Sequence, residues 1–158
     1  QGHYCPNGTV TPDQFPCPPG SFTGSTNLTA AEECTACPAM QACGWATGVD
    51  TNPSLPCKPG HYCPEGTPAV DRFPCRPGTY SNRSDLVSAD QCFSCPESYY
   101  CLSGGAAPSD ACQPGYYCPS GTKFADEFPC PMGRYNPDHG QSDVTACLYC
   151  TQGHYCEK

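Results

Sequence analysis

The stretch Cys57-Lys-Pro-Gly-His-Tyr-Cys63-Pro-Glu-Gly-Thr-Pro-Ala-Val-Asp-Arg-Phe-Pro-Cys75 contains a pattern that occurs three times in the chain. Each copy begins with Cys-Pro-x-Gly-Thr and ends with Phe-Pro-Cys, and eleven residues separate its two cysteines: Cys5 and Cys17, Cys63 and Cys75, Cys118 and Cys130. His-Tyr or Tyr-Tyr precedes the first cysteine of each copy. Self-similarity at a fixed period indicates a repeat architecture rather than a single globular core.

The other cysteines extend this repeat over the whole chain. The first set of cysteines recurs after 58 residues and the second after 55, with the spacing C-x11-C-x16-C-x2-C-x5-C before a last cysteine. The third set lacks its sixth cysteine, which explains the odd total of 17. We therefore expect three cysteine-rich repeats, at residues 1–57, 58–112 and 113–158, the third incomplete at its C-terminal end.

The composition indicates that crosslinks, rather than a hydrophobic core, hold the fold together. Leu, Val and Phe total 16 of 158 residues and Ile is absent, about 10% of the chain, where roughly 20% is the usual lower limit for folding by apolar burial. The 17 cysteines exceed the roughly 8–10% that is typical of a disulfide scaffold. The 20 prolines and 16 glycines disfavour long helices.

Several features predict an extracellular protein, secreted or at the cell surface. So many disulfides need an oxidising compartment, and three sequons, at Asn7, Asn27 and Asn82, predict N-linked glycans. No apolar run approaches the roughly 18–20 residues of a membrane span, so we expect no membrane insertion. The net charge of −8 disfavours nucleic acid as a partner, because phosphate backbones attract clustered basic residues.

The fold class that follows is small and disulfide-rich, mostly irregular with short β ribbons, in an elongated tandem-repeat rod with little regular secondary structure. Pro-Gly pairs after many of the cysteines suit type II turns, in which glycine supplies the positive φ. Thr29–Cys34 and Ser88–Cys92 are each expected to form one helical turn.

The spacing resembles a known family of extracellular repeats. The run Cys75-Arg-Pro-Gly-Thr-Tyr, with sixteen residues between its cysteine and Cys92-Phe-Ser-Cys95-Pro, resembles the ephrin-receptor-like cysteine-rich repeat, which is related in style to the TNF-receptor cysteine-rich domain. Residues 17–38 and 130–150 match the same pattern, so the resemblance covers nearly the whole chain. It implies a non-catalytic spacer or adhesion role and names no ligand.

This resemblance also implies part of the disulfide connectivity: Cys17–Cys34, Cys75–Cys92 and Cys130–Cys147. For the remaining cysteines two schemes are open. A ladder would join Cys37 to Cys57, Cys43 to Cys63, Cys95 to Cys112, and Cys101 to Cys118. Local closure would instead join cysteines within each doublet, such as Cys57 to Cys63 and Cys112 to Cys118. The ladder leaves Cys5, Cys150 and Cys156 without partners, and local closure leaves only Cys5.

The same cysteines admit chemical alternatives, which we consider weaker. The C-x-x-C pairs Cys34/Cys37, Cys92/Cys95 and Cys147/Cys150 have a spacing seen in zinc and redox sites, but the sequons favour oxidised cysteines. His3, His61 and His154 occupy a slot that Tyr116 fills in another copy, which favours a structural role. No catalytic motif is recognisable. We expect no enzyme activity, no metal site and no cofactor.

The preferred function is a non-catalytic extracellular structural protein, a glycosylated repeat rod that forms or belongs to a filament, stalk or matrix strand. The alternative is a receptor-type or adhesion ectodomain that binds a protein ligand along its side, with Trp45, the single tryptophan, as a candidate contact residue. Self-association is the expected partnership. Cys156 is equivalent by spacing to Cys43 and Cys101, and Cys5 to Cys63 and Cys118, so a disulfide between Cys5 and Cys156 of adjacent chains is a further expectation.

Overall fold

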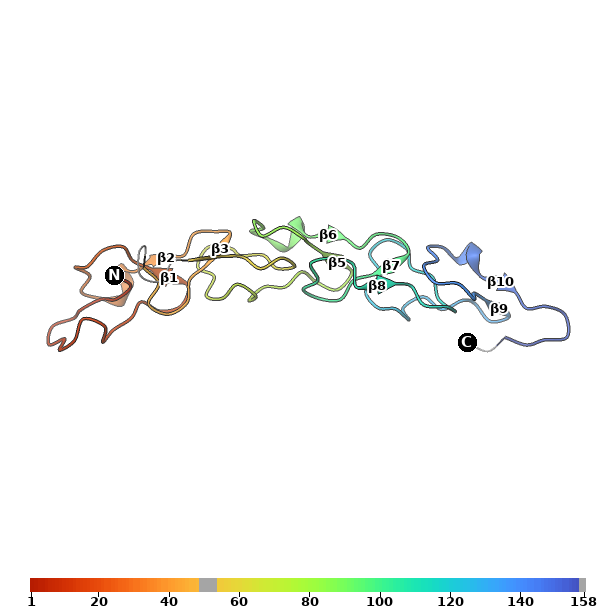
Figure 1. Cartoon of the computed structure of the whole chain (residues 1–158), viewed down its shortest axis with the longest axis horizontal. Coiled ribbons are helices and arrows are strands. Elements are labelled where there is room, and N and C mark those ends of the chain that lie inside the picture. The colour runs from red at the N-terminus through yellow and green to blue at the C-terminus, as the bar shows by residue number, and fades with distance from the viewer. Residues whose placement is uncertain (49–53, 157–158) are drawn as a thin grey trace. The chain divides into compact units, whose positions relative to one another are not determined.

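The computed structural model describes residues 1–48 and 54–156, and the chain forms two compact units. The first unit consists of Gln1–Pro74 with Arg83–Gln91, and the second of Cys75–Asn82 with Cys92–Lys158. Each unit is built from the same kinds of turn and ribbon (Figure 1). The expected repeat boundaries after residues 57 and 112 describe the sequence, and they stay a prediction.

Five antiparallel ribbons, each of two strands, make up the β structure of the described residues. In the first unit, β1 (Ser21–Phe22) pairs with β2 (Thr35–Ala36), and β3 (Gln41–Ala42) pairs with β4 (Leu55–Pro56). In the second unit the pairs are β5 (Thr79–Tyr80) with β6 (Phe93–Ser94), β7 (Tyr99–Tyr100) with β8 (Asp110–Ala111), and β9 (Arg134–Tyr135) with β10 (Leu148–Tyr149). The described part of the chain has no α-helix. The predicted disulfide-rich class, mostly irregular with short ribbons, is therefore confirmed.

Three single turns of 3-10 helix precede the cysteine that closes each long disulfide loop. Two of them, η1 (Ala31–Glu33) and η2 (Ala89–Gln91), lie where the sequence predicts a helical turn. The third, η3 (Val144–Ala146), is the equivalent turn of the last repeat, where Asp143 caps the turn by accepting a hydrogen bond from the Thr145 N–H. No helical turn was predicted there, because the three residues of η3, Val-Thr-Ala, include no acidic residue, whereas η1 and η2 include one or two.

The core of each unit consists mainly of cystine. Among the described residues, fourteen apolar side chains are buried, and twelve of them are cysteines. The other two are Ala42 and Leu86. No buried side-chain nitrogen or oxygen atom of the described residues lacks a hydrogen-bond partner. Such a core needs little aliphatic side chain, as the scarcity of Leu, Val and Ile predicts.

Leu86 is the large aliphatic residue with no exposed surface. Replacing it by alanine is expected to destabilise the protein by about 2–5 kcal/mol, because the buried methyl groups are lost and a cavity is left. Leu28 is the matched control, since it occupies the same place one repeat earlier, where it is half-buried. Thermal unfolding of the two variants should therefore show a clearly larger loss for Leu86→Ala than for Leu28→Ala. Equal losses would contradict the burial of Leu86.

Candidate interaction surfaces of the repeats

Eight disulfides join sixteen of the seventeen cysteines, and all of them are short-range. Three of them close loops with a sequence separation of 17: Cys17–Cys34, Cys75–Cys92 and Cys130–Cys147. These are the pairs that the resemblance implies. The other five have a separation of six and close what we call the short loops: Cys37–Cys43, Cys57–Cys63, Cys95–Cys101, Cys112–Cys118 and Cys150–Cys156.

The structure therefore contradicts the ladder and has local closure instead. Cys37 and Cys43 are not bonded to Cys57 and Cys63, and Cys95 and Cys101 are not bonded to Cys112 and Cys118. The reason is a backbone reversal in the middle of each short loop, where the third residue after the first cysteine has positive φ: Met40, Gly60, Ser98, Gly115 and Gly153. This reversal brings the two Cα atoms to 5.7–6.0 Å, within the range that a disulfide spans without moving the backbone.

Local closure also corrects the expectation for the terminal cysteines. Cys156 is bonded to Cys150 in its own chain, so it has no thiol to offer to Cys5 of another chain. Cys5 is a free, half-buried cysteine. By position it matches Cys63 and Cys118, each of which pairs with the cysteine six residues earlier.

The two cysteines of each C-x-x-C pair belong to different disulfides. Cys34 is bonded to Cys17 whereas Cys37 is bonded to Cys43, and the two later C-x-x-C pairs are divided in the same way. A zinc site needs deprotonated thiolates, and a redox pair needs a bond between its own two cysteines. Neither arrangement exists at these positions.

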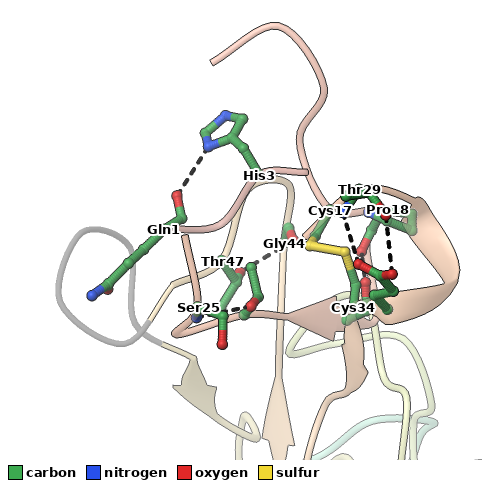
Figure 2. The surroundings of a disulfide bond; sticks show 12 residues. Gln1, His3, Cys17, Pro18, Ser25, Thr29, Cys34, Gly44 and Thr47 are labelled. Carbon is green, nitrogen blue, oxygen red and sulfur yellow. Dashed lines mark hydrogen bonds between the residues drawn. A yellow bond between two sulfur atoms is a disulfide. The ribbon is translucent and has the colours of Figure 1, made fainter. Parts of the chain in front are cut away.

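The surroundings of the Cys17–Cys34 disulfide illustrate how side chains fix the turns (Figure 2). The His3 ring approaches the backbone carbonyl of Gln1 with its Nδ1, at 3.0 Å, and the Thr47 hydroxyl donates to the carbonyl of Gly44 at 3.1 Å. His61 repeats the histidine contact, with its Nδ1 3.2 Å from the Pro59 carbonyl. These contacts support a structural role for the histidine slot.

Aromatic pairs, which were not predicted from the sequence, form a second repeated feature. The tyrosine before the first cysteine of the repeated pattern packs against the phenylalanine of Phe-Pro-Cys, with ring centroids 5.5–5.7 Å apart: Tyr4 with Phe15, Tyr62 with Phe73, and Tyr117 with Phe128. Ring pairs at this separation stabilise a fold beyond their buried area. The eleven-residue spacing of the three copies was the signal available in the sequence.

A third repeated feature is a contact between a short loop and the Cys-Pro-x-Gly-Thr turn that follows it. We call this contact the junction, and the segments 5–9, 63–67 and 118–122 the Gly-Thr turns. In the first unit the short loop 37–43 contacts the turn 63–67 through three backbone hydrogen bonds: the Met40 N–H to the Cys63 carbonyl at 2.9 Å, Cys43 to Thr67 at 3.0 Å, and Gly66 to Cys37 at 2.9 Å.

The second unit has the same junction. There the short loop 95–101 contacts the turn 118–122 through the equivalent bonds: the Ser98 N–H to the Cys118 carbonyl at 2.9 Å, Cys101 to Thr122 at 3.1 Å, and Gly121 to Cys95 at 2.9 Å. Two independent copies with the same three bonds mark the junction as a property of the repeat. Because backbone groups make all three bonds, the junction tolerates different side chains in its loops.

A glycine lies at the centre of each junction. Gly20 has a φ of +88°, and a Cβ built on it would overlap the carbonyl oxygen of Gly66. Gly78 has a φ of +84° and the same relation to Gly121. Both Gly20 and Gly78 are buried. The junction thus depends on backbone approaching backbone where no side chain fits, a common reason for glycine in close-packed structures.

The junctions bury the residues that form them. In the first junction Cys37, Cys43 and Cys63 are 0% exposed and Thr67 is 1% exposed. In the second junction the corresponding residues Cys95, Cys101, Cys118 and Thr122 have the same exposures. The buried threonine hydroxyls have hydrogen-bond partners within their own turns, because each donates to the proline carbonyl three residues earlier.

The charged groups lie on the surface and have local roles. Glu33 accepts hydrogen bonds from the Thr29 backbone N–H and hydroxyl, and the backbone bond in particular lowers the pKa of its carboxyl. Arg83 donates two hydrogen bonds to Asp85 and lowers the pKa of that carboxyl. The backbone bond at the start of η3 lowers the pKa of Asp143. These carboxylates are solvent-exposed, so screening keeps their effect on stability small.

The three sequon asparagines, Asn7, Asn27 and Asn82, are all exposed. Trp45 is 64% exposed, although it makes a contact with its surroundings. Over residues 1–48 and 54–156, no three histidine, cysteine or carboxylate side chains are grouped so that they could hold a metal ion. A search of the same residues for a long apolar helix of membrane-spanning type finds none.

Comparison with protein-family models and with curated protein sequences finds no match for this chain. The disulfides and short ribbons are compatible with a cysteine-rich repeat protein, and this many disulfides is typical of extracellular proteins. The junction is a buried contact that both units repeat with the same three backbone hydrogen bonds.

Proposed function

We propose that the chain is a non-catalytic extracellular structural protein, a glycosylated repeat array that forms or belongs to a filament, stalk or matrix strand. The junction is the observation that supports this function best. It joins a short loop to the next Gly-Thr turn twice, with the same three hydrogen bonds and the same glycine contact. In repeat proteins, neighbour-to-neighbour contacts of this kind carry stability along the array.

The oxidised, cystine-based core supports the same proposal. A catalytic site needs side chains held in a partly dry pocket with tuned protonation, and here the buried residues are mainly disulfides. The long-loop disulfides have the pairing that the resemblance to the ephrin-receptor-like repeat implies, and that repeat is of an extracellular type. A scaffold of this kind serves a spacing or assembling function without a cofactor.

Electron microscopy of the protein from its natural source tests the proposal. Long strands with a regular axial repeat are the expected result, because a structural array displays its period along its length. Separate short particles that carry a bound protein ligand would contradict the proposal and favour a receptor-type ectodomain. Trp45 is then the first residue to replace by alanine in a ligand-binding assay.

Glycan mapping provides a second prediction, independent of assembly. Asn7, Asn27 and Asn82 are expected to carry N-linked glycans in secreted material, because all three sequons present an exposed asparagine. Removal of the glycans with a peptide-N-glycanase, an amidase that converts the glycosylated asparagine to aspartate, should mark these three sites in peptide mass spectra. Secreted protein with all three asparagines unmodified would contradict the extracellular, glycosylated part of the proposal.

A further inference from the structure

The eight disulfides follow one another along the sequence, and no two of their loops overlap. All seventeen cysteines lie among the described residues, and the loops run in order from Cys17–Cys34 to Cys150–Cys156. About half of the Cα–Cα steps of the chain lie inside these loops. The segments between the loops carry no crosslink, so their folding depends on non-covalent contacts.

Two of these segments are spanned by the junctions. We call residues 44–56 and 102–111 the junction linkers. The first junction joins the short loop 37–43, which precedes its linker, to the Gly-Thr turn 63–67, which follows it, and the second junction has the same topology. Two routes therefore connect the loop to the turn: a direct route through three hydrogen bonds, and a long route through the linker and the next short-loop disulfide.

Tension along the chain acts first on the direct route, because that route is the shorter one. Its three backbone bonds join the same two segments, whose cysteines are buried, so the bonds resist together. Gly20 holds the short loop at this contact, since it accepts a hydrogen bond from the Cys37 N–H at 2.8 Å and donates one to the Cys43 carbonyl at 2.7 Å. Gly78 makes the equivalent two bonds in the second unit.

The other contact across each linker is a ribbon, which adds little resistance. The β3–β4 ribbon pairs the first short loop with the end of its linker, and the β7–β8 ribbon does the same at the second junction. A single two-stranded ribbon is only marginally stable in water. Opening of the three junction bonds therefore frees the linker.

From these observations we propose that each junction is a release that responds to tension. Pulling on the array opens the three hydrogen bonds as a unit and frees the linker, while the disulfide loops on both sides stay closed. When the tension falls the junction forms again, because one disulfide closes the short loop and another anchors the start of the turn. This inference rests on the proposed structural function and adds reversible extension to it.

The lengths of the linkers give the size of each step. Counted on the sequence, 14 Cα–Cα steps separate Cys43 from Cys57, and 11 separate Cys101 from Cys112. At roughly 3.5 Å for each extended step, opening releases about 50 Å at the first junction and about 40 Å at the second. The disulfide that follows each linker adds 5.8–5.9 Å between its Cα atoms, a span comparable to that of the closed contact.

The disulfides set an upper limit to the extension. The three copies of the repeated pattern, which Tyr–Phe pairs close, have twelve Cα–Cα steps between their cysteines and release about 40 Å each. With all non-covalent contacts open and all disulfides intact, the chain reaches about 300 Å, against about 550 Å for the reduced chain. The first junction thus gives the longest single step.

The second junction has one hydrogen bond more than the first. The Ser120 hydroxyl donates to the Cys95 carbonyl at 3.0 Å, whereas the first junction has Glu65 at this position, and an ionised carboxylate cannot donate. We therefore expect the second junction to open at a higher force than the first, because forced opening is governed by the rate at which these contacts break.

Stretching of single molecules of the oxidised 158-residue chain tests the inference. The chain is held by peptide tags at its two ends, so that the Cys5 thiol takes no part in attachment. The expected result is a stepwise extension that reverses on relaxation, with a longest step of about 50 Å and a limit of about 300 Å. Reductant should raise the limit to about 550 Å.

The two central glycines provide variants that control each other. Gly20→Ala should abolish the longest step or move it to lower force, and should leave the step of the second junction unchanged. Gly78→Ala should leave the longest step unchanged and weaken one step of about 40 Å. Ser120→Ala removes a single hydroxyl bond from the second junction, so this milder variant should lower the opening force there without affecting the first junction.

The stretching curve of the unmodified chain keeps the test independent of how the variants fold. A smooth extension without the longest step, or a longest step that persists unchanged in folded Gly20→Ala protein, would overturn the inference. Regular strands in micrographs of native material combined with a smooth stretching curve would reject the release and leave the proposed function standing. Separate short particles that still extend in these steps would support the release and reject the proposed function alone.

Discussion

Reduction of the eight disulfides is expected to abolish the cooperative unfolding transition altogether. Each disulfide contributes about 2–4 kcal/mol, mainly by restricting the unfolded chain, so eight together exceed the roughly 5–15 kcal/mol net stability of a folded domain. The remaining buried apolar side chains that are not cysteine, Ala42 and Leu86, are far too few to replace that contribution. The reduced chain should therefore behave as an unfolded polymer.

The measurement compares oxidised protein with protein that is reduced and alkylated under denaturing conditions. Thermal scans and resistance to limited proteolysis should show a transition and a protected core in the oxidised sample alone. Mock-treated protein, carried through denaturant without reductant, is the control for damage during handling. A reduced sample that keeps a cooperative transition at an unchanged temperature would show that the disulfides are not what holds the fold.

Replacing Gly20 or Gly78 by alanine should also destabilise the protein strongly. Alanine at positive φ costs about 1–2 kcal/mol of backbone strain, and forcing its Cβ into a packed carbonyl typically costs about 1–3 kcal/mol more. The clash is with backbone atoms, the carbonyls of Gly66 and Gly121, which cannot rotate away as a side chain would. The junction has to open to relieve it.

The variant Gly115→Ala separates the two contributions to this loss. Gly115 has the same positive φ but an open Cβ position, so its replacement costs the backbone strain alone. Gly20→Ala should therefore unfold at a clearly lower temperature than Gly115→Ala, and the Gly66 amide, which donates to Cys37, should lose its protection from hydrogen exchange. Equal stabilities for the two variants would mean that the close glycine contact is absent in solution.

The sequence predicts the class of fold because composition decides it. Few aliphatic residues and 17 cysteines leave crosslinking as the main way to stabilise a structure, and Pro-Gly turns prevent long helices. The 3-10 turns near residues 31 and 89 were predictable for the same reason, since they involve neighbours in sequence. Local features of this kind need no knowledge of which distant segments meet.

The disulfide scheme of the short loops was harder to predict, since the spacing suits both local closure and a ladder. What decides it is a backbone reversal within each loop, and at Met40 and Ser98 this reversal occurs at a residue other than glycine. Positive φ at such residues is uncommon, so sequence alone gave little reason to expect it there. The glycines of the other loops were the available signal.

The junction was not predictable from spacing at all. It depends on the carbonyl of Gly66 reaching Gly20, 46 residues away in sequence, and on backbone groups that every residue possesses. Local closure makes this contact necessary, because with no disulfide linking one short loop to the next, hydrogen bonds and close packing have to join them. The wrong prediction of the ladder and the failure to predict the junction therefore have the same physical origin, which is the local closure of the short loops.

Mapping the disulfides without reduction tests this account most directly. Cleavage after the exposed Trp45 and after Arg72 cuts the chain on both sides of Cys57 and Cys63. Local closure predicts that residues 46–72 are released as a separate peptide containing its own disulfide, because no crosslink spans the cut after Trp45. If residues 46–72 instead stay bonded to the peptide that contains Cys37 and Cys43 until reductant is added, the ladder is correct, and the account of a non-covalent junction is wrong.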